Sequence, residues 1–161
     1  MKSVFLFFGI LLSLSLKAQE KITLYNPEAD ARKDLEKAIQ KAQDQHKHVL
    51  IQVGGNWCPW CIRLHGVFES EAKIDSILKS DYVFILINYS KENKNEVVLA
   101  DLGYPQRFGF PVLLVLDQEG NRLHTQNTAY LEKDKGYDTD KIIGFLLDWN
   151  EKALDPKSYV K

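Results

Sequence analysis

The chain contains two cysteines, Cys58 and Cys61, and both lie in the stretch GGNWCPWCIRLH that runs from Gly54 to His65. Two thiols at this spacing can form a disulfide with each other, exchange that disulfide with another protein, or bind a metal ion. A tryptophan precedes each cysteine, and Pro59 follows the first one. These residue types make the stretch the first candidate for chemistry in the sequence.

A purely structural disulfide would contribute little here. A disulfide stabilises a protein mainly by restricting the unfolded chain, and the gain grows with the length of the closed loop. For a loop of about four residues the gain is roughly 1.9 kcal/mol, compared with about 3 kcal/mol for a loop of about 15 residues. Because the two cysteines are close in sequence, the bond would hold no distant segments together.

A metal site is the second interpretation. Cys58, Cys61 and His65 form the pattern C-x2-C-x3-H, and three such ligands can hold zinc or copper. The sequence has no second cysteine pair and no obvious fourth ligand nearby. In this interpretation the protein is a non-enzymatic binding protein, for a metal ion or for a peptide, and this is the alternative to redox chemistry.

Redox chemistry fits the position of the motif. Residues 48–55, HVLIQVGG, are predicted to form a buried strand, and residues 59–67 a helix. Cys58 would then lie at the N-terminus of the helix, where unpaired backbone N–H groups and the helix dipole favour a thiolate. Cys61, one turn later, would face the same sulfur and could resolve a mixed disulfide.

The two tryptophans are candidates for contact with a partner protein. Trp57 would shield one side of the cysteine pair and offer a flat apolar surface to a peptide, although a place in the core explains this residue equally well. Trp60 lies between the cysteines. We expect it to be exposed, which favours a contact role.

Apolar periodicity predicts further elements on both sides of the motif. The expected helices are one that begins at Pro27 with Asn26 as its N-cap, one that is capped by Ser70 and ends near Lys79, a short one that stops at Gly103, and one within 137–150. The expected strands are 81–89, a hairpin within 111–126, and an optional extra strand at 22–25. This order predicts an α/β fold with a mixed sheet of about four strands flanked by helices.

The composition indicates a single globular domain. The chain has 161 residues, of which 45% are hydrophobic and 27% charged, and its formal net charge is −1. This length is typical of one domain with a buried core, and the absence of a basic block argues against nucleic acid as a partner. We expect the domain to span 19–161, with its core at about 27–150 and an irregular C-terminal tail.

Residues 1–18 have the pattern of a secretory signal peptide. Lys2 is followed by the apolar run VFLFFGILLSLSL, and Ala18 is a small residue before the expected cleavage point. The run is short for a transmembrane span, although an uncleaved membrane anchor is the alternative. We therefore expect the protein to work outside the cytoplasm, in the periplasm, where disulfides persist.

The segments VLIQVGGNWCPWC, VFILIN and GFPVLLVLDQEG resemble, in order and spacing, those of the thioredoxin superfamily. The resemblance covers roughly residues 27–150, and the chain is similar to secreted bacterial members such as the periplasmic thioredoxin-like domain of the thiol:disulfide interchange protein. It implies a thioredoxin-like fold and a thiol–disulfide oxidoreductase without a bound cofactor, because the Cys58–Cys61 dithiol is the redox centre. The implied partners are cysteine-containing secreted or periplasmic proteins and an upstream electron donor or acceptor, and we expect a monomer.

The resemblance also implies roles for individual residues. Cys58 matches the nucleophilic cysteine, and Cys61 matches the resolving one. Pro111 matches the cis-proline that lies against the cysteine pair, and Phe110 matches the residue whose backbone meets a substrate strand. The expected substrate contacts are Trp57, Pro59, Trp60, Phe110 and Pro111.

Two positions depart from the family pattern, and a third differs from the strongly oxidising members. Gln52 stands where thioredoxins carry a buried aspartate that helps to move the proton of the resolving cysteine, and an amide cannot take that proton. Leu86 stands near the position of a frequent lysine. The sequence therefore identifies no proton carrier for Cys61. Trp60 replaces the chargeable histidine of strongly oxidising members, which favours a reducing role.

Overall fold

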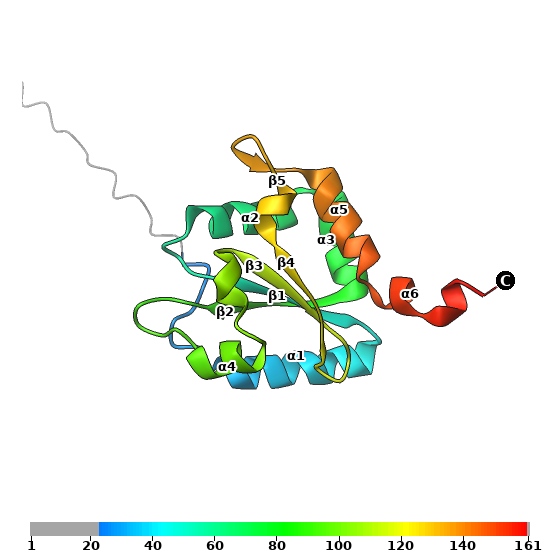
Figure 1. The fold of residues 1–161 in the computed structure, drawn as a ribbon, viewed down its shortest axis with the longest axis horizontal. Helices are drawn as coiled ribbons and strands as arrows, with labels where there is room; N and C mark the ends of the chain where they lie inside the picture. The colour runs from blue at the N-terminus through cyan, green and yellow to red at the C-terminus, as the bar shows by residue number, and fades with distance from the viewer. Residues whose placement is uncertain (1–22, 161) are drawn as a thin grey trace, which may run out of the picture.

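A mixed sheet of four strands forms the centre of the protein, which a computed structural model describes from residue 23 to residue 160 (Figure 1). The strands are β1 (His48–Gly54), β2 (Tyr82–Asn88), β3 (Val112–Leu116) and β4 (Arg122–Asn127), in the order β2-β1-β3-β4. β1 runs parallel to β2 and antiparallel to β3, and β3 pairs antiparallel with β4. The predicted α/β fold with a mixed four-stranded sheet is confirmed.

Helices cover both faces of the sheet. On one face lie α1 (Ala31–Gln45) and α4 (Glu96–Asp101), and on the other lie α2 (Pro59–Ser70), α3 (Ala72–Asp81) and α5 (Thr139–Asp148) (Figure 1). The remaining elements are short: η1 (Pro105–Phe108), η2 (Thr128–Leu131), β5 (Glu132–Lys133), β6 (Gly136–Tyr137), α6 (Glu151–Leu154) and η3 (Pro156–Ser158). Between residues 23 and 160, no helix has the length and apolar character that crossing a membrane requires.

The alternation of side chains along β1 decides which of them reach each face. Val49, Ile51 and Val53 pack in the cluster formed with α1 and α4, whereas Leu50 packs in the cluster formed with α2, α3 and α5. Because both faces are covered, every residue of β1 is buried, which explains its nearly continuous apolar sequence. Gln52 shares the face of Leu50, so β1 places a polar amide beneath α2.

The first helix begins at Ala31, later than predicted. The side chain of Asp30 caps it by accepting a hydrogen bond from the backbone N–H of Lys33 at 3.1 Å. Asn26, the predicted N-cap, instead accepts a hydrogen bond from the N–H of Glu28 in a preceding turn. Asparagine and aspartate cap helices about equally well, so residue type alone could not choose between the two positions.

Other boundaries also differ from the prediction. The helix α2 continues through Ser70, so Glu71 rather than Ser70 precedes α3. Residues 23–25 form no strand, and residue 22 of the optional strand lies outside the described residues, as does the predicted signal peptide. The C-terminal tail, which was expected to be irregular, contains α6 and η3.

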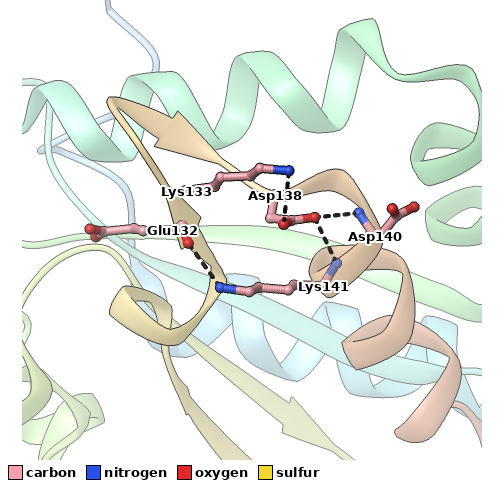
Figure 2. A network of polar contacts seen from close by, with 5 residues as sticks. All are labelled: Glu132, Lys133, Asp138, Asp140 and Lys141. Carbon is pink, nitrogen blue, oxygen red and sulfur yellow. Dashed lines mark hydrogen bonds and ion pairs between the residues drawn. The ribbon is translucent and has the colours of Figure 1, made fainter.

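The β5–β6 hairpin is an element that the sequence pattern does not predict, and polar contacts fix it to the start of α5 (Figure 2). Asp138 accepts hydrogen bonds from the backbone N–H groups of Asp140 at 3.0 Å and Lys141 at 3.3 Å. Its other carboxylate oxygen lies 3.7 Å from Lys133 Nζ, and Lys141 Nζ donates to the carbonyl of Glu132 at 3.0 Å. Asp138 is thus both the N-cap of α5 and an ion-pair partner of the hairpin.

Replacing Asp138 with alanine is expected to lower the Tm by about 4 °C at neutral pH, because both cap hydrogen bonds are lost. Burial raises the pKa of Asp138, but the hydrogen bonds from Lys141 and Asp140 and the charges of Lys133 and Lys141 together outweigh it, so the net pKa is lowered. The stabilisation is therefore complete above about pH 5 and is lost as the pH falls through the lowered pKa. Thermal unfolding should show that the difference in Tm between Asp138→Ala and wild type becomes smaller in acid. Asp138→Asn, which can still cap the helix, should lower the Tm less.

Candidate active site

The two cysteines lie where β1 ends and α2 begins, and a disulfide bond joins them. Cys58 is the N-cap of α2, and its Sγ accepts a hydrogen bond from the backbone N–H of Cys61 at 3.1 Å. Pro59 takes the first helical position, where a missing N–H costs nothing. The predicted placement of the cysteine pair at the start of a helix is confirmed.

The two cysteines differ in their access to solvent. Cys58 is 4% exposed and Cys61 is 0% exposed. The free N–H groups at a helix N-terminus stabilise negative charge on a sulfur placed there. A thiolate formed at Cys58 on reduction therefore combines electrostatic stabilisation with some access to a partner, whereas Cys61 faces only the protein interior.

An aromatic cluster borders Cys58. Trp57 is 56% exposed, its Nε1 donates to the carbonyl of Tyr89 at 2.7 Å, and its ring meets Phe110 edge-on with the centroids 5.5 Å apart. Phe110 also lies 4.7 Å from the Tyr89 ring and packs against the buried cluster that Tyr25 forms with the two cysteines. The peptide bond from Phe110 to Pro111 is cis, as predicted. Of the two interpretations of Trp57, this exposure favours the contact role over a place in the core.

Trp60 is less exposed than predicted. Its ring is half-buried and meets the Tyr137 ring edge-on, with the centroids 5.5 Å apart. The guanidinium carbon of Arg63 lies over the ring, 4.7 Å from its centroid. The Tyr137 hydroxyl donates to the carbonyl of Trp60 at 3.4 Å. Tyr137 belongs to the β5–β6 hairpin, so a segment far along the chain covers Trp60 and leaves Trp57 as the more exposed of the two tryptophans.

Tyr25 is a residue of the site that sequence patterns do not reveal. Its backbone N–H donates to Asn56 Oδ1 at 2.8 Å, and Asn56 Nδ2 donates to the Tyr25 carbonyl at 2.7 Å. This reciprocal pair holds Tyr25 against the loop that precedes Cys58. The side chain of Tyr25 is buried, 2% exposed, in the same cluster as both cysteines.

Gln52 is the centre of a buried polar network beneath the cysteines. Its Nε2 donates to Tyr25 Oη at 2.5 Å and to the Cys61 carbonyl at 3.0 Å. Burial raises the pKa of Tyr25, because a phenolate would lose its hydration, and this outweighs the opposing effect of the hydrogen bond from Gln52. Tyr25 therefore remains a neutral hydroxyl. Leu86, at the position expected for a lysine, adds only apolar packing to the cluster.

The predicted metal ligands do not converge. Cys58 and Cys61 share a disulfide, while the ring of His65 stacks on Phe84 at 5.8 Å and its Nε2 lies 3.4 Å from the Glu69 carboxylate. Over the described range 23–160, no group of three or more His, Cys, Asp or Glu side chains is arranged to hold a metal ion. The geometry gives the metal-binding alternative no support.

The fold and the site together define a class of protein, in which a four-stranded mixed sheet presents a C-x-x-C disulfide at the N-terminus of a helix. The sequence pattern of the thioredoxin-like family matches residues 30–118, which is more than half of the chain. The chain belongs to the thioredoxin-like family. Comparison with curated proteins finds no match.

Solved structures from several bacteria share this architecture. The disulphide isomerase of Xylella fastidiosa Temecula1 aligns with a TM-score of 0.67 at 23% identity, over 79% of this chain and 96% of that protein. The oxidised DsbD C-terminal domain of Neisseria meningitidis gives 0.53 at 18% identity, over 74% and 96%. A thioredoxin from Thermus thermophilus gives 0.54 at 13% identity, over 74% and 85%. At such identities the likeness establishes the fold.

Proposed function

We propose that the protein is a thiol–disulfide oxidoreductase that exchanges its Cys58–Cys61 disulfide with cysteines of other proteins. The observation that carries this proposal is the disulfide at a helix N-terminus, in which Cys58 has some access to solvent and Cys61 has none. A disulfide that closes so short a loop stabilises a fold only weakly, so a structural role does not account for the pair.

The reaction follows from the unequal positions of the two sulfurs. In the reducing direction, the Cys58 thiolate attacks a substrate disulfide, forms a mixed disulfide and releases one substrate thiolate. The Cys61 thiolate then attacks Cys58 Sγ, closes the internal disulfide and releases the second substrate thiolate. Two electrons pass to the substrate, and the two protons lost by the cysteines balance those gained by the released thiolates. The reverse sequence oxidises a substrate.

Residues around Cys58 provide a surface for the substrate. Pro59 and Trp57 are exposed on either side of Cys58. Phe110 precedes β3, so its backbone lies outside the strand pairing of the sheet and is placed to meet an extended substrate segment. Trp60 and Pro111 contribute less surface, since one is half-buried and the other buried. A pocket extends this surface past Trp57, and it is lined by Tyr89, Ser90, Lys91, Glu92 and Lys94.

The setting of the reaction is also part of the proposal. The N-terminal sequence has the pattern of a signal peptide, which supports a location outside the cytoplasm, in the periplasm. The partners there would be cysteine-containing proteins and an upstream electron donor or acceptor. We propose that the protein works in the reducing direction, because Trp60 places no chargeable group beside the thiolate of Cys58. We also propose that it works as a monomer.

Turnover of a protein disulfide by the wild-type protein tests the proposal. The reduced protein should reduce a protein disulfide repeatedly when glutathione and its reductase supply electrons. Equilibration with glutathione buffers should place the potential of the pair nearer to about −270 mV than to about −120 mV, the values typical of thioredoxin and of a strong oxidant. Absence of turnover in both directions would favour the non-enzymatic alternative.

A further inference from the structure

We propose that the Tyr25 hydroxyl donates the hydrogen bond that stabilises the Cys61 thiolate while Cys61 resolves a mixed disulfide. This inference rests on the proposed function, since it concerns the second step of that exchange. It assigns a task to a residue outside the C-x-x-C motif, in a site where Gln52 stands at the position of the acidic group that the family resemblance implies.

The Tyr25 hydroxyl and the Cys61 sulfur face the same small space. A methyl group built on the Cα atom of Gly54 would lie 2.5 Å from Cys61 Sγ and 2.7 Å from Tyr25 Oη. Tyr25 and Cys61 also belong to one buried cluster, in which they are 2% and 0% exposed. With the disulfide open, the hydroxyl is therefore a polar neighbour of a sulfur that solvent does not reach.

The network around Gln52 fixes which partner donates. An amide nitrogen carries two hydrogens and no acceptor, and Gln52 Nε2 directs them to Tyr25 Oη and to the Cys61 carbonyl. Tyr25 Oη is therefore an acceptor toward Gln52. Its own hydrogen remains for another acceptor, and the thiolate of Cys61 is an acceptor in the space that both groups face.

A thiolate at Cys61 needs such a donor, because burial disfavours the charged form. Tyr25 can supply a hydrogen at any physiological pH, since burial keeps it protonated. The other titratable groups near Cys61 have different partners or roles. Cys58 is the sulfur that Cys61 attacks, and His65 pairs with Glu69. Tyr137 raises the pKa of Tyr25 further. Tyr25 thus stabilises charge at Cys61 by a hydrogen bond and does not accept its proton.

The two steps of exchange can be measured separately with dithiobis(nitrobenzoate) as the substrate disulfide. Attack by Cys58 on this reagent releases one coloured nitrothiobenzoate, and resolution by Cys61 releases a second. In stopped-flow measurements on the reduced protein, the first phase reports on Cys58 and the second on Cys61. The pH dependence of the second phase gives the apparent pKa of Cys61.

For Tyr25→Phe, the second phase is expected to slow about tenfold at pH 7, and its midpoint to rise by about one pH unit, as for loss of one hydrogen bond to a charged group. The first phase should not change. The variant keeps the ring, and the pairing with Asn56 uses only the backbone of Tyr25, so its position is retained. Tyr82→Phe is the matched control, because it removes a buried hydroxyl that donates to the Leu146 carbonyl at 2.6 Å, in the α5 region.

An unchanged second phase in Tyr25→Phe would overturn the inference while leaving the proposed function intact. A wild-type protein without a first phase would overturn the proposed function itself, and this inference with it. An equal shift in Tyr82→Phe would show that lower stability, and not the lost donor, changes the midpoint, which also overturns the inference. If Tyr25→Phe does not fold, Gln52→Met is the second test. It removes the hydrogen bond that positions the Tyr25 hydroxyl, so it should also raise the midpoint of the second phase. An unshifted midpoint in Gln52→Met would contradict the inference.

Discussion

The Cys61→Ser protein is expected to accumulate as a mixed disulfide between Cys58 and a protein substrate. Cys58 keeps its place at the N-terminus of α2, so it can still attack, but no second sulfur is left to release the adduct. When the full sequence is expressed, a near-stoichiometric share of the protein should carry adducts that a reductant removes. Non-reducing electrophoresis and mass spectrometry of the adducts would identify the proteins bound, while multiple turnover should fall to background.

Cys58→Ser is the matched control, because it removes the other half of the same disulfide. Cys61 is 0% exposed and cannot be reached by a protein disulfide, so this variant should carry few or no adducts. A metal site predicts a different result, since each substitution would remove one ligand and neither would trap a protein. A structural staple predicts only a small and equal loss of stability in both variants. Equal adduct levels in the two variants would contradict the assigned roles.

The parts of the fold that could be predicted are those that local sequence specifies. The buried strand β1, the glycines that end it and Pro59 lie next to one another in the chain, so the strand–helix junction that holds the cysteines follows from neighbouring residues. The β3–β4 hairpin is similarly local, because Asp117 and Asn121 close its turn and Gly120 adopts a φ of 85° there. Such signals need no knowledge of the tertiary structure.

The parts that could not be predicted depend on contacts between distant segments. Tyr25 reaches the site through Asn56, and nothing in the residues around Tyr25 indicates that pairing. The exposure of Trp60 was predicted wrongly because Tyr137, from a hairpin of very short strands, covers it. Sequence comparison with the family could show that Gln52 replaces an acidic residue. Only the structure shows that Gln52 donates to a tyrosine hydroxyl, and that this hydroxyl and Cys61 Sγ face the same space at Gly54.

Gly54→Ala is expected to destabilise the protein by about 3 kcal/mol, at the upper end of the usual cost of overpacking a core. The added Cβ would lie 2.5 Å from Cys61 Sγ, 2.7 Å from Tyr25 Oη and 3.1 Å from Cys61 Cβ, all within a buried site. Because Gly54 ends β1 in register with Asn88, the backbone cannot move away without breaking strand pairing. The clash should therefore displace Cys61 or Tyr25, and denaturant unfolding should show the loss in both redox states.

Gly66→Ala provides the matched control for this substitution. Gly66 lies within α2, is exposed, and has no atom within 4 Å of the position of an added Cβ. Alanine there should stabilise the protein by about 0.5–1 kcal/mol, because it restricts the unfolded chain and favours the helix. The two glycines lie on either side of the same disulfide in the sequence. Changes of opposite sign in the free energy of unfolding would therefore show that Gly54 is required by the close approach of Cys61 and Tyr25. A Gly54→Ala protein as stable as wild type would contradict the tight packing on which both the site and the assignment of Tyr25 depend.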